Sequence, residues 1–260
     1  MQSKTIKIER FSIEIKNLPP SFRGVKIAHL SDLHSKNFSE KENKVLEILQ
    51  SLNPDFIFIT GDFINETTKD LESCQNFWKK LSESYSKKVF GVLGNHDHYH
   101  PQFKIINNLL EESGIKILEN EAVILRRNED FIHPIRKLSI SNGVYLIGVD
   151  DPHEGYDDVE KAMAGIEAGA SKILIAHSPE IFRKVKGKGV DLVLVGHTHG
   201  GQINIPFITN LLLPLKYDKK YKSGLFEENS TFLYVSRGIG TTLLPIRFNA
   251  PPEIALIELK

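Results

Sequence analysis

The chain of 260 residues has little cysteine, no excess of charge of either sign and no apolar run at its N-terminus. The single Cys74 excludes an intrachain disulfide and a thiolate zinc cluster, which leaves histidine and carboxylate ligands for any metal. Its 33 basic and 33 acidic residues balance to a formal net charge of +0, which argues against nucleic acid as a partner. Residues 1–16 carry charges every few positions, a pattern typical of neither a signal peptide nor a spanning helix. We therefore expect a cytoplasmic protein.

The apolar pattern predicts one domain over residues 1–260, because no linker divides the chain. Residues 5–16 alternate apolar and polar positions, as a half-exposed strand does. Apolar runs that alternate with amphipathic segments indicate the α/β class. We expect buried strands at 25–30, 55–60, 88–93, 172–176 and 192–195, helices at 40–52, 68–84, 103–113 and 157–168, antiparallel strands between 115 and 149, and terminal strands near 231–236 and 253–259.

Two histidines follow the strand expected at 192–195, in the sequence DLVLVGHTHGGQ. Glycines flank His197 and His199 and allow the backbone to turn tightly on either side. In an extended segment, side chains two residues apart point to the same side, so both imidazoles are expected to converge on one small object such as a metal. A single H-x-H motif is more often a pair of surface or hydrogen-bonded core histidines. The metal interpretation therefore depends on the other strand ends.

Polar motifs follow four other expected strands. They are Asp32 and His34, then Gly61-Asp62, then Gly94-Asn95-His96-Asp97, and finally His177. Each motif alone is ordinary, since a buried histidine is usually a hydrogen-bonded core residue. Open α/β sheets place their chemistry at the carboxyl ends of their strands, however, and this repetition at successive strand ends predicts a metal site there.

The number of donors indicates two metal ions. Two Asp, one Asn and four His are too many for one tetrahedral ion. Hydrolytic metal pairs lie ~3.5–4 Å apart and share a carboxylate and a bridging water. We expect Asp62 to bridge, with Asp32, His34 and His199 on one ion and Asn95, His177 and His197 on the other. These nitrogen and oxygen donors suit Mn²⁺, Zn²⁺ or Fe²⁺.

His96 lies next to Asn95 and is not needed for coordination. A histidine there can donate a proton to a leaving oxygen, and Asp97 could hold it charged and oriented. The alternative is that His96 and Asp97 only shape the turn. A metal pair supplies hydroxide near neutral pH and neutralises phosphate oxygens, so no nucleophilic side chain is required.

These motifs, taken in order along the chain, resemble those of the calcineurin-like metallophosphoesterase family. The resemblance implies two mixed β-sheets packed as a sandwich, with helices outside, and it implies the same ligand assignments. A narrower resemblance lies in His199-Gly200-Gly201-Gln202, in Gly148–Pro152 and in the C-terminal run SRGIGTTLLPIRFNAPPEIALIEL. These segments are similar to a bacterial branch of membrane-associated phosphodiesterases that includes pyrophosphatases acting on UDP-2,3-diacylglucosamine, a lipid A precursor.

An apolar segment, INIPFITNLLLPL at 203–215, follows the last two histidines, and lysines follow it up to residue 222. It is too short to span a bilayer. Two interpretations stay open: it lies against the inner face of the membrane or an acyl chain, or it folds over the core. Arg237 and Arg247 are candidates for binding substrate anions, and either could equally form a structural ion pair.

From the sequence we expect the chain to be a binuclear-metal phosphoesterase. It is expected to hydrolyse a phosphodiester or pyrophosphate by attack of metal-bridging hydroxide, with a lipid-linked nucleotide such as UDP-2,3-diacylglucosamine as a candidate substrate. The alternatives within the enzyme class are a phosphomonoesterase and a nuclease or cyclic-nucleotide phosphodiesterase. The alternative outside it is a metal-binding scaffold subunit.

Overall fold

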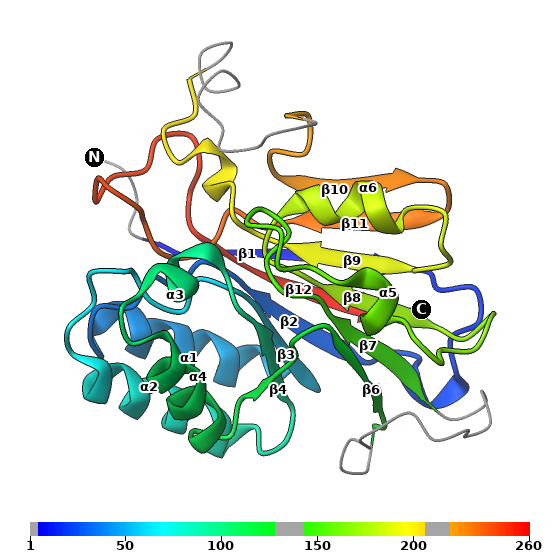
Figure 1. Ribbon diagram of the computed structural model, residues 1–260, viewed down its shortest axis with the longest axis horizontal. Coiled ribbons are helices and arrows are strands. Elements are labelled where there is room, and N and C mark those ends of the chain that lie inside the picture. Colours follow the sequence, from blue (N-terminus) through cyan, green and yellow to red (C-terminus); the bar gives the residue numbers. More distant parts are fainter. Residues whose placement is uncertain (1–4, 128–142, 206–218) are drawn as a thin grey trace.

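Two six-stranded mixed sheets pack face to face, with helices on both outer faces (Figure 1). The computed structural model describes residues 5–127, 143–205 and 219–260. This arrangement confirms the α/β class and the sandwich that the sequence resemblance implied.

The first sheet places the last strand of the chain between the first two. β1 and β12 are parallel, β12 and β2 are antiparallel, and β2, β3, β4 and β5 are parallel neighbours. The order across the sheet is β1 (Lys7–Ile13), β12 (Glu253–Leu259), β2 (Lys26–Leu30), β3 (Phe56–Thr60), β4 (Val89–Val92) and β5 (Lys116–Ile117).

The second sheet has three parallel neighbours at its centre, β9, β8 and β7, and β11 is parallel to β9. Its two edge strands, β10 and β6, are antiparallel to their neighbours. The order is β10 (Gly224–Glu228), β11 (Thr231–Val235), β9 (Leu192–Val195), β8 (Lys172–Ile175), β7 (Val144–Gly148) and β6 (Glu121–Leu125).

Amphipathic helices cover the outer face of each sheet. On the first sheet, the apolar faces of α1 (Glu40–Leu52), α2 (Leu71–Ser84) and α4 (Phe103–Glu112) share a core with β2, β3 and β4. On the second sheet, α5 (Val159–Ala162) and α6 (Phe182–Val185) do the same. The start of α1 is fixed by a capping box in which Ser39 and Glu42 satisfy each other's backbone N–H groups. A short helix, α3 (Asn95–Tyr99), follows β4 directly.

A third core lies between the two sheets and joins them. Phe58 and Phe90 of the first sheet and Ile175 and Leu194 of the second are fully buried in it. Because both sheets contribute side chains to this core, the carboxyl ends of the strands in one sheet are held at a fixed distance from those in the other. That distance decides whether residues from the two sheets can contact the same bound group.

Three sequence expectations need correction. α5 ends at Ala162 rather than near 168, and Gly165 and Gly169 beyond it have φ values of 76° and 82°, which a helix does not use. β5 pairs in parallel with β4, so the segment from 115 onward is not wholly antiparallel. β10 was not expected, although Asn229 and Ser230, with φ values of 51° and 60°, form the tight turn that joins it to β11.

Two further expectations from the sequence concern the region between 115 and 149 and a membrane-spanning helix. Residues 128–142, part of the region where antiparallel strands were expected, lie outside the described residues. Within the three described ranges, no helix has the length and apolar character that crossing a membrane requires.

The core between the sheets gives a stability prediction. Phe58→Ala should lower the free energy of unfolding by about 3–5 kcal/mol, because it removes a ring buried between both sheets and leaves a cavity. Urea denaturation followed by circular dichroism measures this change. Phe248→Ala is the control, because Phe248 is 53% exposed and should cost about 0.5 kcal/mol or less. Equal losses in the two variants would contradict the packing described.

Candidate metal centre

Five strand ends meet at one edge of the sandwich. Asp32, Asp62 and Asn95 follow the parallel strands β2, β3 and β4, while His177 and His197 follow the parallel strands β8 and β9. Parallel strands end at the same edge of a sheet, so the chain delivers these side chains to one place. All seven residues predicted as ligands are 7% exposed or less.

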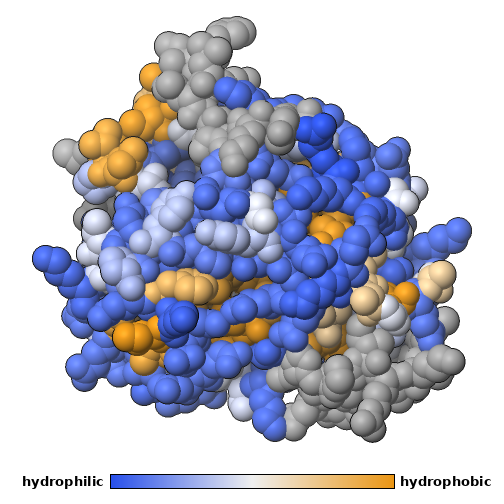
Figure 2. All heavy atoms as spheres, viewed as in Figure 1, coloured by the Kyte–Doolittle hydropathy of each residue, from blue (hydrophilic) through white to orange (hydrophobic). Residues whose placement is uncertain are grey.

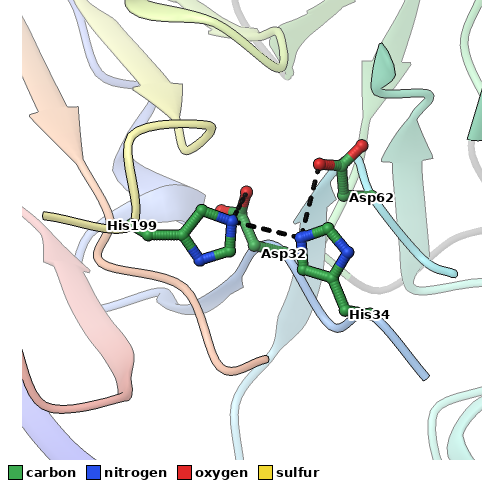
Figure 3. A group of neighbouring side chains, drawn as sticks. All are labelled: Asp32, His34, Asp62 and His199. Atoms are coloured by element: carbon green, nitrogen blue, oxygen red, sulfur yellow. Dashed lines mark hydrogen bonds and ion pairs between the residues drawn. The ribbon is translucent and has the colours of Figure 1, made fainter. Parts of the chain in front are cut away.

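Asp32, His34, Asp62 and His199 form the first group of donor atoms (Figure 3). One atom from each lies within 4.8 Å of the others. The Nε2 atoms of His34 and His199 are 3.1 Å apart. Asp32 Oδ1 lies 3.4 Å from His199 Nε2, and Asp62 Oδ2 lies 3.5 Å from His34 Nε2. The four side chains point toward one another, as ligands of a common ion would.

Asn95, His177 and His197 form a second group beside the first. Asn95 Oδ1, His177 Nε2 and His197 Nδ1 are each 3.1 Å from the other two. Asp62 Oδ2 lies 3.3 Å from His177 Nε2. The same carboxylate oxygen thus faces His34 of the first group and His177 of the second, which is the position expected of a bridging ligand.

The spacing within both groups fits divalent cations. Two ligands of a tetrahedral ion with bonds of about 2.1 Å are about 3.4 Å apart. The donor distances in the two groups run from 3.1 to 3.5 Å. Neutral imidazoles, an amide oxygen and carboxylates are also the donor types that such ions accept. The residues present therefore fit a pair of ions.

Electrostatics in the site also favour cations. Burial lowers the pKa of His34 and of His199 to about 3, so both imidazoles are neutral and can act as ligands. Burial and the neighbouring His177 hold the pKa of His197 well below its usual range. Burial works against a charged His177, yet the Asp62 carboxylate raises the pKa of this imidazole well above its usual value. The space between Asp62 and His177 thus favours positive charge, and a metal ion binding there would displace the proton.

The backbone at the site is held in an unusual conformation. Asp32, His34, Asp62, His197 and His199 have φ values of 50°, 44°, 54°, 69° and 51°. Side chains other than glycine rarely adopt this left-handed region, and residues held there cluster at functional sites. The sequence analysis assumed an extended segment at His197 and His199. The positive φ values show that this assumption is wrong. The rings of these two histidines diverge, and each joins a different donor group.

Two glycines make room for the donors. A Cβ atom on Gly94 would collide with the Asp62 carboxylate and the His177 ring. A Cβ atom on Gly196 would collide with the side chains of Ser31 and Asp32. Any larger residue at either position would displace a carboxylate of the site.

His96 lies at the exposed side of the two groups. Its backbone N–H donates to Asp62 Oδ1 over 2.9 Å, and its ring packs edge-on against His34 with ring centroids 4.9 Å apart. The Nδ1 atom makes a short hydrogen bond with Glu66 Oε2. The other ring nitrogen, Nε2, takes no part in this hydrogen bond. Glu66 was not expected from the sequence, because it follows Asp62 by four residues in a loop with no recognisable motif.

Asp97 does not contact the His96 ring. Its Oδ1 accepts from the backbone N–H of Ile64 over 3.2 Å, and its Oδ2 accepts from that of Gly94 over 3.0 Å. Successive residues of a helical turn point in different directions, which explains why the expected contact to its neighbour is not made. Burial and the nearby Asp62 raise the pKa of Asp97 to about 7. Asp97 holds the loops after β3 and β4 together, and Glu66 holds the His96 ring.

The two candidate arginines bind protein groups. Arg237 forms ion pairs with Glu9 and Glu253, which matches the structural alternative left open by the sequence. Arg247 donates to the carbonyls of Gly240, Arg237 and Ala250. Its guanidinium also lies 3.3 Å from His199 Nδ1, on the side away from the donor groups.

Comparisons with known proteins agree with this geometry. Residues 25–201 match the family model described as calcineurin-like phosphoesterase. The chain is 30% identical over 266 residues to metallophosphoesterase YkuE of Bacillus subtilis, an alignment that covers 100% of this chain and 87% of that protein. It is 28% identical over 239 residues to phosphodiesterase YaeI of Escherichia coli, with 90% and 82% covered.

A solved structure shares the fold. The Thermus thermophilus protein TT1561 superposes with a TM-score of 0.52 at 14% identity, and the match covers 83% of this chain and 90% of that one.

The two donor groups predict how metal content responds to substitution. After reconstitution with Mn²⁺ and desalting, the protein should retain about two ions per chain, His34→Ala and Asn95→Ala about one each, and Asp62→Ala close to none. Inductively coupled plasma mass spectrometry measures this content. His98→Gln is the control, because His98 pairs with Asp150 outside both groups and should leave the content unchanged. Full metal content in Asp62→Ala would contradict the shared carboxylate.

Proposed function

Because the chain belongs to the calcineurin-like phosphoesterase family, and is thus a metal-dependent phosphoric ester hydrolase, we propose that it hydrolyses a phosphodiester or pyrophosphate bond at a binuclear centre. The observation that carries the binuclear proposal is the position of Asp62 Oδ2, 3.5 Å from His34 Nε2 and 3.3 Å from His177 Nε2. The name of the relative YaeI, phosphodiesterase, supports a diester rather than a monoester substrate.

The proposed reaction divides its tasks between ions and side chains. Bound divalent ions lower the pKa of a water molecule and neutralise phosphate oxygens. Asp62 faces both donor groups, and each group has three further donors that would hold one ion. His96, at the exposed side, donates a proton from Nε2 to the leaving oxygen, and Glu66 fixes the orientation of the ring through Nδ1. Asp97 keeps the loop that carries Asn95 and His96 against the loop that carries Asp62.

We propose a lipid-linked nucleotide such as UDP-2,3-diacylglucosamine as the substrate class, with the protein in the cytoplasm and in peripheral contact with the inner face of the membrane. The segment proposed for that contact is 203–222, of which residues 206–218 lie outside the described structure. What supports this proposal is the sequence of the segment, apolar residues followed by lysines, directly after His199.

The substrate class is tested by comparing three compounds with Mn²⁺-loaded protein. Bis(p-nitrophenyl) phosphate should turn over faster than p-nitrophenyl phosphate, and UDP-2,3-diacylglucosamine should release UMP. Asp62→Asn should reduce diester turnover by about 10³-fold, because the bridging ligand serves both ions. A preference for the monoester would overturn the diester proposal. Turnover of small diesters with no release from the lipid nucleotide would overturn the lipid substrate alone.

The contact between Glu66 and His96 gives a separate prediction. Glu66→Gln should lower kcat about tenfold for an alkyl leaving group and less for p-nitrophenolate, which needs little protonation, with KM unchanged. In a His96→Asn background the same substitution should have no further effect, because Glu66 acts through the ring. Steady-state kinetics on bis(p-nitrophenyl) phosphate and on a diester with an alkyl leaving group measure these changes in kcat and KM. Glu47→Gln, on the exposed face of α1, is the matched control. Equal effects of Glu66→Gln in both backgrounds would refute the positioning role.

A further inference from the structure

Exposed apolar side chains gather at one place on the surface. Of the nine large hydrophobic residues that are exposed in the described ranges, five lie in two segments that touch each other. Figure 2 shows orange side chains at the upper left rim, where Figure 1 draws the loop between β11 and β12. We call these five residues the apolar rim: Ile205 is 40% exposed, Leu243 103%, Leu244 54%, Ile246 55% and Phe248 53%.

The two segments of the rim are joined by backbone hydrogen bonds. Asn204 N–H donates to the Phe248 carbonyl over 2.7 Å, and Phe248 N–H donates to the Gln202 carbonyl over 2.8 Å. Residue Ile203 forms a bridge with Phe248 in the parallel sense. The segment after His199 and the loop before β12 therefore form one surface.

Polar contacts hold the rim in place. The Gln202 side-chain amide donates to the carbonyls of Thr242 and Leu244, and its oxygen accepts from the Thr242 N–H over 2.9 Å. Arg247, which lies within the rim segment, turns inward and donates to three backbone carbonyls. The tip of the loop is thus attached at both ends, and its apolar side chains are presented on a fixed frame.

Leu243 shows that core packing does not explain the rim. Its backbone has a φ of 53°, a conformation that costs about 1–2 kcal/mol for a residue with a Cβ atom. Its side chain is fully exposed, so no burial against the described residues offsets this cost. Burial of the side chain against something outside the chain would offset it.

The rim adjoins the metal centre directly. Gly240 N–H, at the start of the loop, donates to the Asp32 carbonyl over 2.6 Å. At its far end, the Arg247 guanidinium contacts His199. Whatever binds the rim is therefore brought to the edge of the site that holds Asp32 and His199.

Charge around the rim indicates the kind of partner. Residues 239–252 contain no acidic residue, and their one charged side chain is Arg247. Lys222 reaches the base of the rim, where its Nζ donates to Asn204 Oδ1 over 2.9 Å. Protein partners of ordinary affinity bury roughly 20–30 residues on each side, far more than this tip offers. A small apolar tip without acidic side chains and with a lysine at its base is instead typical of interfacial membrane binding.

We propose that the apolar rim docks onto the surface of an anionic lipid bilayer and inserts its side chains among the upper acyl groups. This inference deepens the proposed function, since it gives a lipid-linked substrate a direct route from the bilayer to the metal centre. It extends the contact proposed for 203–222, because Ile205 of that segment inserts together with Leu243, Leu244, Ile246 and Phe248 of the loop before β12.

The test measures binding to vesicles, with no catalytic step. The Mn²⁺-loaded protein is sedimented with sucrose-loaded vesicles of phosphatidylcholine and phosphatidylglycerol at about 2:1. Most of the protein should sediment with the vesicles. Leu243→Ser combined with Ile246→Ser should lower the partition coefficient by about 100-fold, close to tenfold for each apolar side chain withdrawn from the lipid. Ile105→Ser is the matched control, because Ile105 is 48% exposed on α4 and should leave partition unchanged.

Outcomes of this test separate the docking from the hydrolysis. The double variant should keep its circular dichroism spectrum and its turnover of bis(p-nitrophenyl) phosphate, because neither side chain lies in the site. Failure of the wild type to sediment, or equal sedimentation of the double variant, would overturn the docking proposal even with full diesterase activity. Self-association that the double substitution abolishes, without vesicle binding, would likewise overturn it and assign the rim to a second copy of the chain.

Discussion

One carboxylate connects the two halves of this molecule. Asp62 leaves the first sheet at the end of β3, and its Oδ2 atom lies 3.3 Å from His177 Nε2, which follows β8 of the second sheet. The contact requires the sheets to be packed at one separation, and the apolar core between them sets that separation. Buried carboxylates and imidazoles at this edge would be unfavourable on their own, so the site and the sandwich depend on each other.

The sequence predicted what depends on strand periodicity and on the polarity of strand ends. Asp32, Asp62, Asn95, His177 and His197 could be grouped because each follows an apolar run, and parallel strands end together. What the sequence could not supply was the path of the backbone after each strand. The sequence assigned His197 and His199 to different donor groups, but it predicted an extended segment there and not the left-handed φ values of 69° and 51°. Glu66 reaches His96 from a loop without periodicity. The assignment of one domain to residues 1–260 stays a prediction.

Arginine gives a second example of this limit. Arg237 and Arg247 resemble anion-binding residues in the sequence because a guanidinium suits phosphate, but a side chain's partners come from distant parts of the fold. Glu9 reaches Arg237 from β1, and Gly240 meets Arg247 across the loop. Arg247 instead links His199 to a surface loop, so one buried guanidinium contacts both the metal centre and the loop that carries the apolar rim.

The place of β12 has a consequence for how the protein is made. Residues 253–259 separate β1 from β2, and in the described part of the chain β1 has no other partner strand. During synthesis, residues 7–13 therefore stay unpaired until residues 253–259 have left the ribosome. The second sheet has no such dependence and can assemble first. The first sheet, which supplies Asp32, Asp62 and Asn95 to the site, is completed only when residues 253–259 insert between β1 and β2.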